Sequence, residues 1–330
     1  MPLSTRPFGR IGQTPTAIGF GAWAIGGTWG EVTDAEAKDA LNAALDGGMT
    51  FIDTADVYGD GLSERRIAEV LKSCSGPRPF IATKAGRRLN PHAPEGFTLA
   101  NLAAFIDRSR KNLEMDTLDL VQLHCPPDAV YGDAKVYDAL DTLKATGKIA
   151  NYGVSVERID QAMTAMQHPG VTSVQIIYNL FRQRPADAFF AAAKAANVAV
   201  IARVPLASGL LTGKMTAAST FATDDHRSFN RNGEAFDKGE TFSGVPFDVA
   251  LQAVDELRPL VPAGATMAAF ALRWILMADA VSVVIPGAKT AAQSQANAAA
   301  DALPPLDAAT MAAAREIYQR LIAPHVAHLW

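Results

Sequence analysis

The feature that most constrains this chain is a regular alternation between short runs rich in β-branched residues and longer alanine-rich stretches with helical spacing. Eight of the short runs have the length and apolar character of buried strands. They are Ile18–Trp23, Thr50–Thr54, Pro79–Lys84, Leu118–His124, Ile149–Val154, Thr172–Ile177, Val198–Val204 and Val281–Ile285. Strands that alternate with helices predict a parallel sheet whose faces are both covered.

Helical spacing fills the intervals between these strands. The expected helices are Asp34–Leu45, Ser63–Leu71, Leu99–Glu114, Lys135–Lys144, Ile159–Met166, Asp187–Ala195, two within Asp248–Met277, and Thr290–Ala299. Closing eight strands into a ring is the simplest packing, and 330 residues suffice for one such domain spanning residues 1–330. The expected fold is therefore α/β, a (β/α)8 TIM barrel. A doubly wound open sheet is the structural alternative.

Three segments fall outside this repeat. Ser4–Thr14 contains two short runs around Gly9-Arg10, which predict an N-terminal β-hairpin across the bottom of the barrel. Ala207–Pro246 is a long connection after the seventh strand, and connections of this length inside a compact domain usually carry function. Asp307–Ile322 reads as an extra C-terminal helix, followed by the tail Ala323–Trp330.

The composition narrows the class of protein. Hydrophobic residues make up 49% of the chain and charged residues 19%, with a net charge of −4. This balance lacks the basic surface expected of a nucleic-acid-binding protein or of one that binds anionic lipid. Its start lacks a secretory signal, and its apolar runs are too short to cross a bilayer. Two cysteines fit a reducing compartment, so we expect a cytoplasmic protein, monomeric or weakly homo-oligomeric.

Two glycine-rich segments imitate phosphate-binding motifs. Gly19-Phe-Gly-Ala-Trp-Ala24 matches a dinucleotide fingerprint, but a Rossmann loop opens directly into a helix and here Gly26–Gly30 intervenes. Gly209–Lys214 resembles a Walker loop, but it is one residue short and Met215 replaces the hydroxyl that would bind magnesium. Both segments are better explained as turns beside strands.

Four polar residues are more informative. Asp53, Lys84 and His124 end the second, third and fourth expected strands, and Tyr58 lies in the loop after the second. In a barrel of this kind the carboxyl ends of the strands meet at the active face. Each residue alone has an ordinary structural explanation, but together they predict a catalytic group.

The chemistry that suits this group is proton transfer to a carbonyl oxygen. An ammonium at Lys84 is expected to lower the pKa of the Tyr58 phenol, and Asp53 would hold that ammonium charged. A neutral His124 would donate a hydrogen bond to the carbonyl. The attacking group would then be a hydride, which only a cofactor supplies. Lys84 as a Schiff-base lysine is the alternative, although an adjacent acid argues against it.

The sequence predicts no metal site. His325 and His328 have a suitable spacing but no acidic partner beside them, and Asp224-Asp225-His226 is contiguous, which seldom lets all three side chains face one ion.

These motifs resemble the aldo-keto reductase superfamily over nearly the whole chain, in particular a bacterial branch of inositol-operon and general-stress reductases. The matching segments include Gly19–Trp23, Phe51–Gly59, Ile81–Lys84, Leu120–His124, Tyr152–Ser155, Val174–Asn179, Pro205–Lys214 and Val284–Ala288. The resemblance implies a barrel that binds NADPH or NADP+ without a Rossmann fold, and a small-molecule carbonyl or alcohol as substrate. It also implies the catalytic set Asp53, Tyr58, Lys84 and His124.

The same resemblance assigns residues to the cofactor. Ser155 and Gln175 match residues that hold the nicotinamide carboxamide, while other positions match the loop over the pyrophosphate and the segment that holds the adenosine phosphate and adenine. The pyrophosphate loop comprises Leu206, Ser208, Gly209, Leu211 and Lys214, and the adenosine segment comprises Gly287, Lys289, Gln293 and Asn297.

The sequence departs from the family pattern at several positions. Arg203 stands where many relatives stack an aromatic side chain on the nicotinamide, and Val156 replaces a common asparagine. Lys289 is a single cation for the adenosine phosphate, so we expect a moderate preference for NADPH with measurable use of NADH. Because some barrels of this superfamily are regulatory subunits of channels, a non-enzymatic or purely binding role is the alternative, and turnover of NADPH with an aldehyde distinguishes the two.

Overall fold

The computed structural model describes residues 2–27, 29–74 and 76–330. Across these residues, eight parallel strands form one sheet in sequence order, β1 to β8. Hydrogen bonds from Gly19 N to Val284 O (2.9 Å) and from Gly21 N to Pro286 O (3.0 Å) join the first strand region to the last. Parallel bridges pair Ile18 with Val284 and Gly21 with Gly287 at the same junction. The sheet therefore curls into the expected (β/α)8 barrel.

The strands match the expected runs, with small differences at their ends. Their bounds are β1 Phe20–Gly21, β2 Phe51–Asp53, β3 Phe80–Ala85, β4 Leu120–His124, β5 Tyr152–Ser155, β6 Val171–Ile177, β7 Ala199–Arg203 and β8 Val281–Val284. The largest difference is β1, where only Phe20 and Gly21, at the centre of Ile18–Trp23, form a regular ladder, which is with β2.

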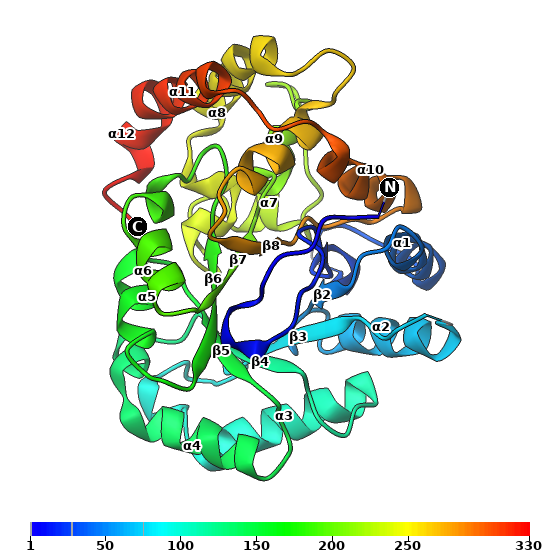
Figure 1. Ribbon diagram of the computed structural model, residues 1–330, viewed down its shortest axis with the longest axis vertical. Coiled ribbons are helices and arrows are strands. Elements are labelled where there is room, and N and C mark those ends of the chain that lie inside the picture. Colours follow the sequence, from blue (N-terminus) through cyan, green and yellow to red (C-terminus); the bar gives the residue numbers. More distant parts are fainter. Residues whose placement is uncertain (1, 28, 75) are drawn as a thin grey trace.

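The helices form an outer ring around the strands (Figure 1). Their bounds are α1 Asp34–Asp46, α2 Leu62–Ser73, α3 Leu99–Leu113, α4 Ala134–Ala145, α5 Ile159–Ala165, α6 Phe189–Ala195, α7 His226–Phe229, α8 Phe247–Leu257, α9 Met267–Leu276, α10 Ala291–Ala299, α11 Ala308–Ile317 and α12 Ala323–Val326. Side-chain caps fix several helix starts; Thr290, for example, accepts a hydrogen bond from Gln293 N before α10.

The expected N-terminal hairpin lies across one end of the barrel (Figure 1, dark blue). Thr5 and Thr16 form an antiparallel bridge, and Arg6 N donates to Pro15 O at 3.0 Å. Phe8 from this hairpin is fully buried and packs against Phe51 and Phe80, with ring centroids 5.3 Å and 5.5 Å away. The hairpin therefore closes the amino end of the barrel with an apolar side chain.

The long connection between β7 and α8 has its own short elements, including α7 and the turns Ala207–Thr212, Lys238–Glu240 and Phe242–Gly244. The C-terminal tail packs against it. Trp330 donates from Nε1 to Asp237 at 3.2 Å and stacks under the guanidinium of Arg182 at 3.7 Å. In the described part of the chain, no helix is both long enough and apolar enough to cross a membrane.

Candidate active site

The alternation of side chains along the strands explains why polar groups gather at one end of the barrel. In β3, Phe80 and Ala82 belong to the interior apolar cluster, so Lys84, two residues on, also points inward. In β4, Leu120 points inward in the same way, which places Gln122 and His124 on the interior face. The carboxyl ends of neighbouring strands thus deliver their last inward residues to one buried space.

Asp53, Lys84 and Tyr58 form a continuous contact chain in this space. The Lys84 ammonium lies 2.5 Å from Asp53 Oδ1, 2.9 Å from the backbone oxygen of Thr54 and 3.2 Å from the Tyr58 hydroxyl. Asp53 is 3% exposed and Lys84 1%. Such a deeply buried ammonium is tolerable because an acid and two further oxygens surround it.

Burial changes the expected ionisation of Tyr58. Burial raises the pKa of the phenol above its usual value, and the Lys84 ammonium offsets only part of that rise. Lys84 thus acts on the Tyr58 pKa in the expected direction, but burial outweighs it and the pKa is raised overall, which the sequence did not predict. Burial also works against the charge on Lys84, but Asp53 and Tyr58 hold the ammonium pKa above its usual value. Tyr58 thus carries a proton, beside a fixed cation that would stabilise its loss.

His124 completes the group. Its ring centroid lies 6.0 Å from that of Tyr58 in an edge-to-face arrangement. Burial and the nearby cations Arg87, Lys84 and Arg203 hold the pKa of His124 well below its usual value, so the imidazole is neutral. Its buried Nδ1 has no hydrogen-bond partner among the described residues. The structure therefore brings the four sequence-predicted catalytic residues together, with a neutral imidazole beside the phenol.

The two residues expected to hold the carboxamide also lie in this space. Gln175 donates from Nε2 to Asp53 Oδ2 at 2.7 Å, and Gln122 donates to the same oxygen at 3.3 Å. Ser155 ends β5 opposite His124 in the strand register. The amide of Gln175 is therefore tied to the Asp53 carboxylate at the polar end of the barrel.

Arg203 ends β7 and reaches across the mouth of the barrel. Its Nη2 donates to Val156 O at 3.0 Å and lies 3.7 Å from Cys125 Sγ, while Nη1 lies 3.4 Å from Glu240 Oε1. Arg87, in the loop after β3, shares the same Glu240 oxygen at 3.2 Å. The mouth is thus lined by a buried charge cluster that includes residues from distant parts of the chain.

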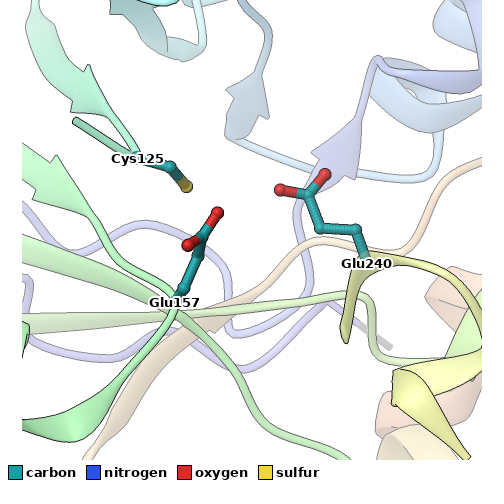
Figure 2. Close-up of side chains that lie close together, drawn as sticks. All are labelled: Cys125, Glu157 and Glu240. Atoms are coloured by element: carbon teal, nitrogen blue, oxygen red, sulfur yellow. The ribbon is translucent and has the colours of Figure 1, made fainter. Parts of the chain in front are cut away.

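Glu157 also belongs to this cluster, with its carboxylate 3.7 Å from Arg87 Nη2, and three members of the cluster present possible metal ligands. The ligand atoms of Cys125, Glu157 and Glu240 lie within 4.8 Å of one another, and Figure 2 shows their side chains directed toward a common space. The sequence signalled no such group. However, two guanidiniums supply the positive charge here: Arg87 and Arg203 hold the Glu240 pKa below its usual value despite burial. Burial also raises the pKa of the Cys125 thiol, which disfavours the thiolate that a metal requires. We interpret the group as an ion-pair cluster.

The segment expected to contact the pyrophosphate follows β7. Ala207, Ser208 and Gly209 have left-handed backbone conformations, with φ of 46°, 55° and 96°. Successive backbone N–H groups in such turns form concavities that bind anions. Ser208 donates from Oγ to the backbone oxygen of Glu240 at 3.0 Å, which ties this turn to the mouth. Leu211 is fully buried beneath it, whereas Lys214 is exposed.

The segment expected to hold the adenosine phosphate follows β8. Gln293 Oε1 accepts a hydrogen bond from Lys289 N at 2.7 Å, and Asn297 donates to Gly287 O at 3.2 Å. Burial lowers the pKa of Lys289, and the guanidinium of Arg227 lowers it further. Arg227 is held by Asp225 at 2.6 Å. Two cations from separate segments therefore approach one another at the start of α10.

A barrel with an Asp–Lys–Tyr contact chain and a neutral histidine at the carboxyl ends of its strands, beside a left-handed turn after β7, has the features of a dinucleotide-dependent oxidoreductase. The chain belongs to the Aldo/keto reductase family, whose sequence profile matches residues 17–319. This confirms the resemblance, the fold class and the reaction class expected from the sequence.

Individual relatives match most of the chain. The aldo-keto reductase YhdN of Bacillus subtilis (strain 168) is 32% identical over 291 residues, which cover 86% of this chain and 85% of the relative. The Schizosaccharomyces pombe aldo-keto reductase yakc, designated NADP(+), is 27% identical over 300 residues, covering 88% and 84%. The solved structure of a glycerol dehydrogenase from Gluconobacter oxydans superposes with a TM-score of 0.76 at 31% identity, covering 99% of this chain and 97% of that one.

Proposed function

We propose that this protein transfers a hydride between NADP(H) and the carbonyl or alcohol carbon of a small polar substrate, with Tyr58 as the proton donor. The observation that carries the proposal is the contact chain from Asp53 through Lys84 to the Tyr58 hydroxyl, beside the neutral His124. The nicotinamide supplies the hydride when it is bound.

Each residue of the chain has a separate task in reduction. Tyr58 gives its proton to the carbonyl oxygen as negative charge develops there. Lys84 stabilises the resulting phenolate from 3.2 Å, and Asp53 keeps the ammonium charged and in place. His124 donates a hydrogen bond that orients the carbonyl. In the alcohol direction the same groups act in reverse, and Tyr58 accepts the proton.

The residues present fit the cofactor. Its phosphates would meet the left-handed turn Ala207–Gly209 and the start of α10 with Lys289, which together offer backbone N–H groups and a cation to an anion. Ser155 and Gln175 would hold the carboxamide. The NADP(+) designation of the S. pombe relative supports the same cofactor.

The lining of the mouth supports a hydroxyl-bearing substrate. The Glu157 carboxylate lies 3.7 Å from Arg87 Nη2, and burial raises the pKa of Glu157 to about 7, so this side chain both donates and accepts near neutral pH. A carboxyl group beside guanidiniums suits hydroxyl groups, each of which donates and accepts. The glycerol dehydrogenase, which acts on a polyol by its name, supports this substrate class.

We also propose a cytoplasmic protein, monomeric or weakly homo-oligomeric, that does not bind nucleic acid. Cys74 and Cys125 are both free thiols, which agrees with a reducing compartment.

The decisive variant is Tyr58→Phe, which removes the proton donor and keeps the ring. We expect the turnover of NADPH with glyceraldehyde to fall by about 10²–10⁴-fold, because that is the scale of general acid catalysis. NADPH affinity, measured by quenching of tryptophan fluorescence, should stay within about twofold of wild type. A Tyr58→Phe protein that turns over near the wild-type rate would refute the assignment. Wild-type protein that binds NADPH but turns over no carbonyl would favour the regulatory or binding role.

A further inference from the structure

The position of the reacting nicotinamide ring is limited by the catalytic side chains. A carbonyl that bonds to both Tyr58 and His124 lies directly over the polar end of the barrel interior. The hydride must reach the carbon of that carbonyl, and reacting atoms come within about 3–3.5 Å. The ring would therefore lie over the ends of the strands beside β4, on the side of β5, where Ser155 is proposed to hold the carboxamide. This placement rests on the proposed function.

Arg203 lines this same space. Its Nη2 bonds to Val156 O, the residue after Ser155, and approaches Cys125 Sγ, which itself lies 3.5 Å from Ser155 Oγ. The residue is 7% exposed, and its Nε is buried without a partner among the described residues. A full, fixed positive charge thus stands beside the ring position, with one donor unfilled.

Glu240 and, to a smaller extent, Glu157 reduce this charge but do not cancel it at the ring position, because burial raises the pKa of Glu157 to about 7 and leaves it only partly ionised. The Glu240 carboxylate lies 3.4 Å from Nη1, whereas Nη2 is the nitrogen that faces β4 and β5. Glu240 is also shared with a second cation, Arg87. The pKa of His124 indicates that the electrostatic potential nearby is positive. After burial, the largest effects on this pKa come from the cations Arg87, Lys84 and Arg203, and all three lower it.

The two redox states of the cofactor differ at this ring. Oxidised nicotinamide carries a positive charge, and reduced dihydronicotinamide is neutral. When the hydride leaves with its two electrons for the carbonyl carbon, that positive charge appears on the ring, while Tyr58 supplies the proton to the oxygen. A guanidinium near the ring therefore acts on one state and not on the other.

We propose that Arg203 sets the redox-state preference of the bound cofactor: its buried guanidinium disfavours the cationic ring, so NADPH binds more tightly than NADP+ and NADP+ leaves readily after carbonyl reduction. Because the rest of the dinucleotide is the same in both states, the ratio of the two dissociation constants isolates the effect at the ring. This ratio is the quantity to measure, and it needs no substrate.

The test compares Kd for NADP+ with Kd for NADPH, each titrated by quenching of tryptophan fluorescence. For Arg203→Met we expect the ratio Kd(NADP+)/Kd(NADPH) to fall by about tenfold, the scale of a screened interaction between charges roughly 6 Å apart that Glu240 partly offsets. Arg203→Lys should retain most of the ratio. Glu240→Gln should raise it, because this change removes the offsetting charge. Arg78→Met, which breaks the arginine–Asp119 pair at the opposite end of the barrel, should leave the ratio unchanged.

A ratio in Arg203→Met within twofold of wild type would overturn the proposal, even if both affinities fell together. If Arg203→Met does not fold because Glu240 is left unpaired, Arg203→Met/Glu240→Gln is compared with Glu240→Gln, and an equal ratio in these two proteins would overturn it as well. Failure of the proposed function has a different signature, since it would appear as retained turnover in Tyr58→Phe.

Discussion

The two ends of the barrel interior are built by the same strands and are similarly buried, but they differ in polarity. At the amino end, Phe51 of β2, Ala199 and Ile201 of β7 and Val283 of β8 form a closed apolar cluster around Phe8. At the carboxyl end, the next inward positions of β2 and β7 are Asp53 and Arg203, both nearly as buried. Burial is thus similar at the two ends, while the free energy of burying these groups has opposite sign.

This difference separates what stabilises the fold from what the protein does. The apolar end contributes to stability by removing apolar surface from water and filling space. The polar end holds buried charges that are tolerated because they are paired, and some of its buried polar atoms, such as His124 Nδ1, have no hydrogen-bond partner among the described residues. Substitutions at the polar end should therefore change chemistry, and substitutions at the apolar end should change stability.

The largest effects are expected within the Asp53–Lys84 pair. Lys84→Met should lower kcat for carbonyl reduction by about 10²-fold or more, because the phenolate of Tyr58 loses its cation. The Asp53 carboxylate would keep the amide donors of Gln175 and Gln122, so the variant should fold. Asp53→Asn should cost less activity, since the ammonium remains. Turnover of NADPH with glyceraldehyde measures both.

The double variant Asp53→Asn/Lys84→Met tests whether the two residues act as a unit. If they do, its loss of activity will be close to that of Lys84→Met alone. Losses that simply multiply would mean that the two residues act independently, and the pairing argument would then be wrong.

The opposite end of the barrel should respond in stability alone. Phe8→Ala opens a cavity among Phe51, Phe80 and their neighbours, and we expect the free energy of unfolding to fall by about 3–5 kcal/mol. The specific activity of the molecules that remain folded should match wild type. Urea denaturation followed by tryptophan fluorescence measures the first quantity, and turnover at low temperature measures the second. Loss of activity without loss of stability would contradict the separation of the two ends.

Much of this division was predictable from local sequence. The eight strands, the plug at the amino end and the residues Asp53, Lys84 and His124 all follow from runs of apolar residues and from what stands at their carboxyl ends. These features depend on spacing along one segment, so the sequence contains them directly. The same rule would have found Arg87 and Glu157, which follow β3 and β5 within two residues, but no pattern marked them as partners.

The charge cluster could not be predicted because its contacts join segments far apart in sequence. Glu240 lies in the long connection after β7, yet it meets Arg87 from the loop after β3. No sequence pattern around Glu240 or Arg87 predicts that these two side chains come into contact. The raised pKa of Tyr58 escaped prediction for a related reason, since it depends on how completely other segments cover the phenol. Features that depend on spacing within one segment can be predicted from the sequence. Contacts and burial that depend on how distant segments pack together cannot.

The smallest expected effect lies at the rim of the polar end, where Lys289 precedes α10. The phosphate that distinguishes NADPH from NADH needs a cation, and we propose that Lys289 supplies it at the start of α10, where a helix N-terminus also favours an anion. We expect Lys289→Met to weaken NADPH binding by about 1–3 kcal/mol, the scale of a charged hydrogen bond, and to leave NADH nearly unchanged. Arg227, which lies close enough to lower the pKa of Lys289, should preserve part of the preference for NADPH.

Lys214→Met is the matched control. The exposed ammonium of Lys214 follows the turn expected at the pyrophosphate, so its loss should affect both dinucleotides equally. The affinities for NADPH and NADH are measured by fluorescence titration. Equal losses of affinity for the two cofactors in Lys289→Met would mean that Lys289 does not contact the phosphate that distinguishes them.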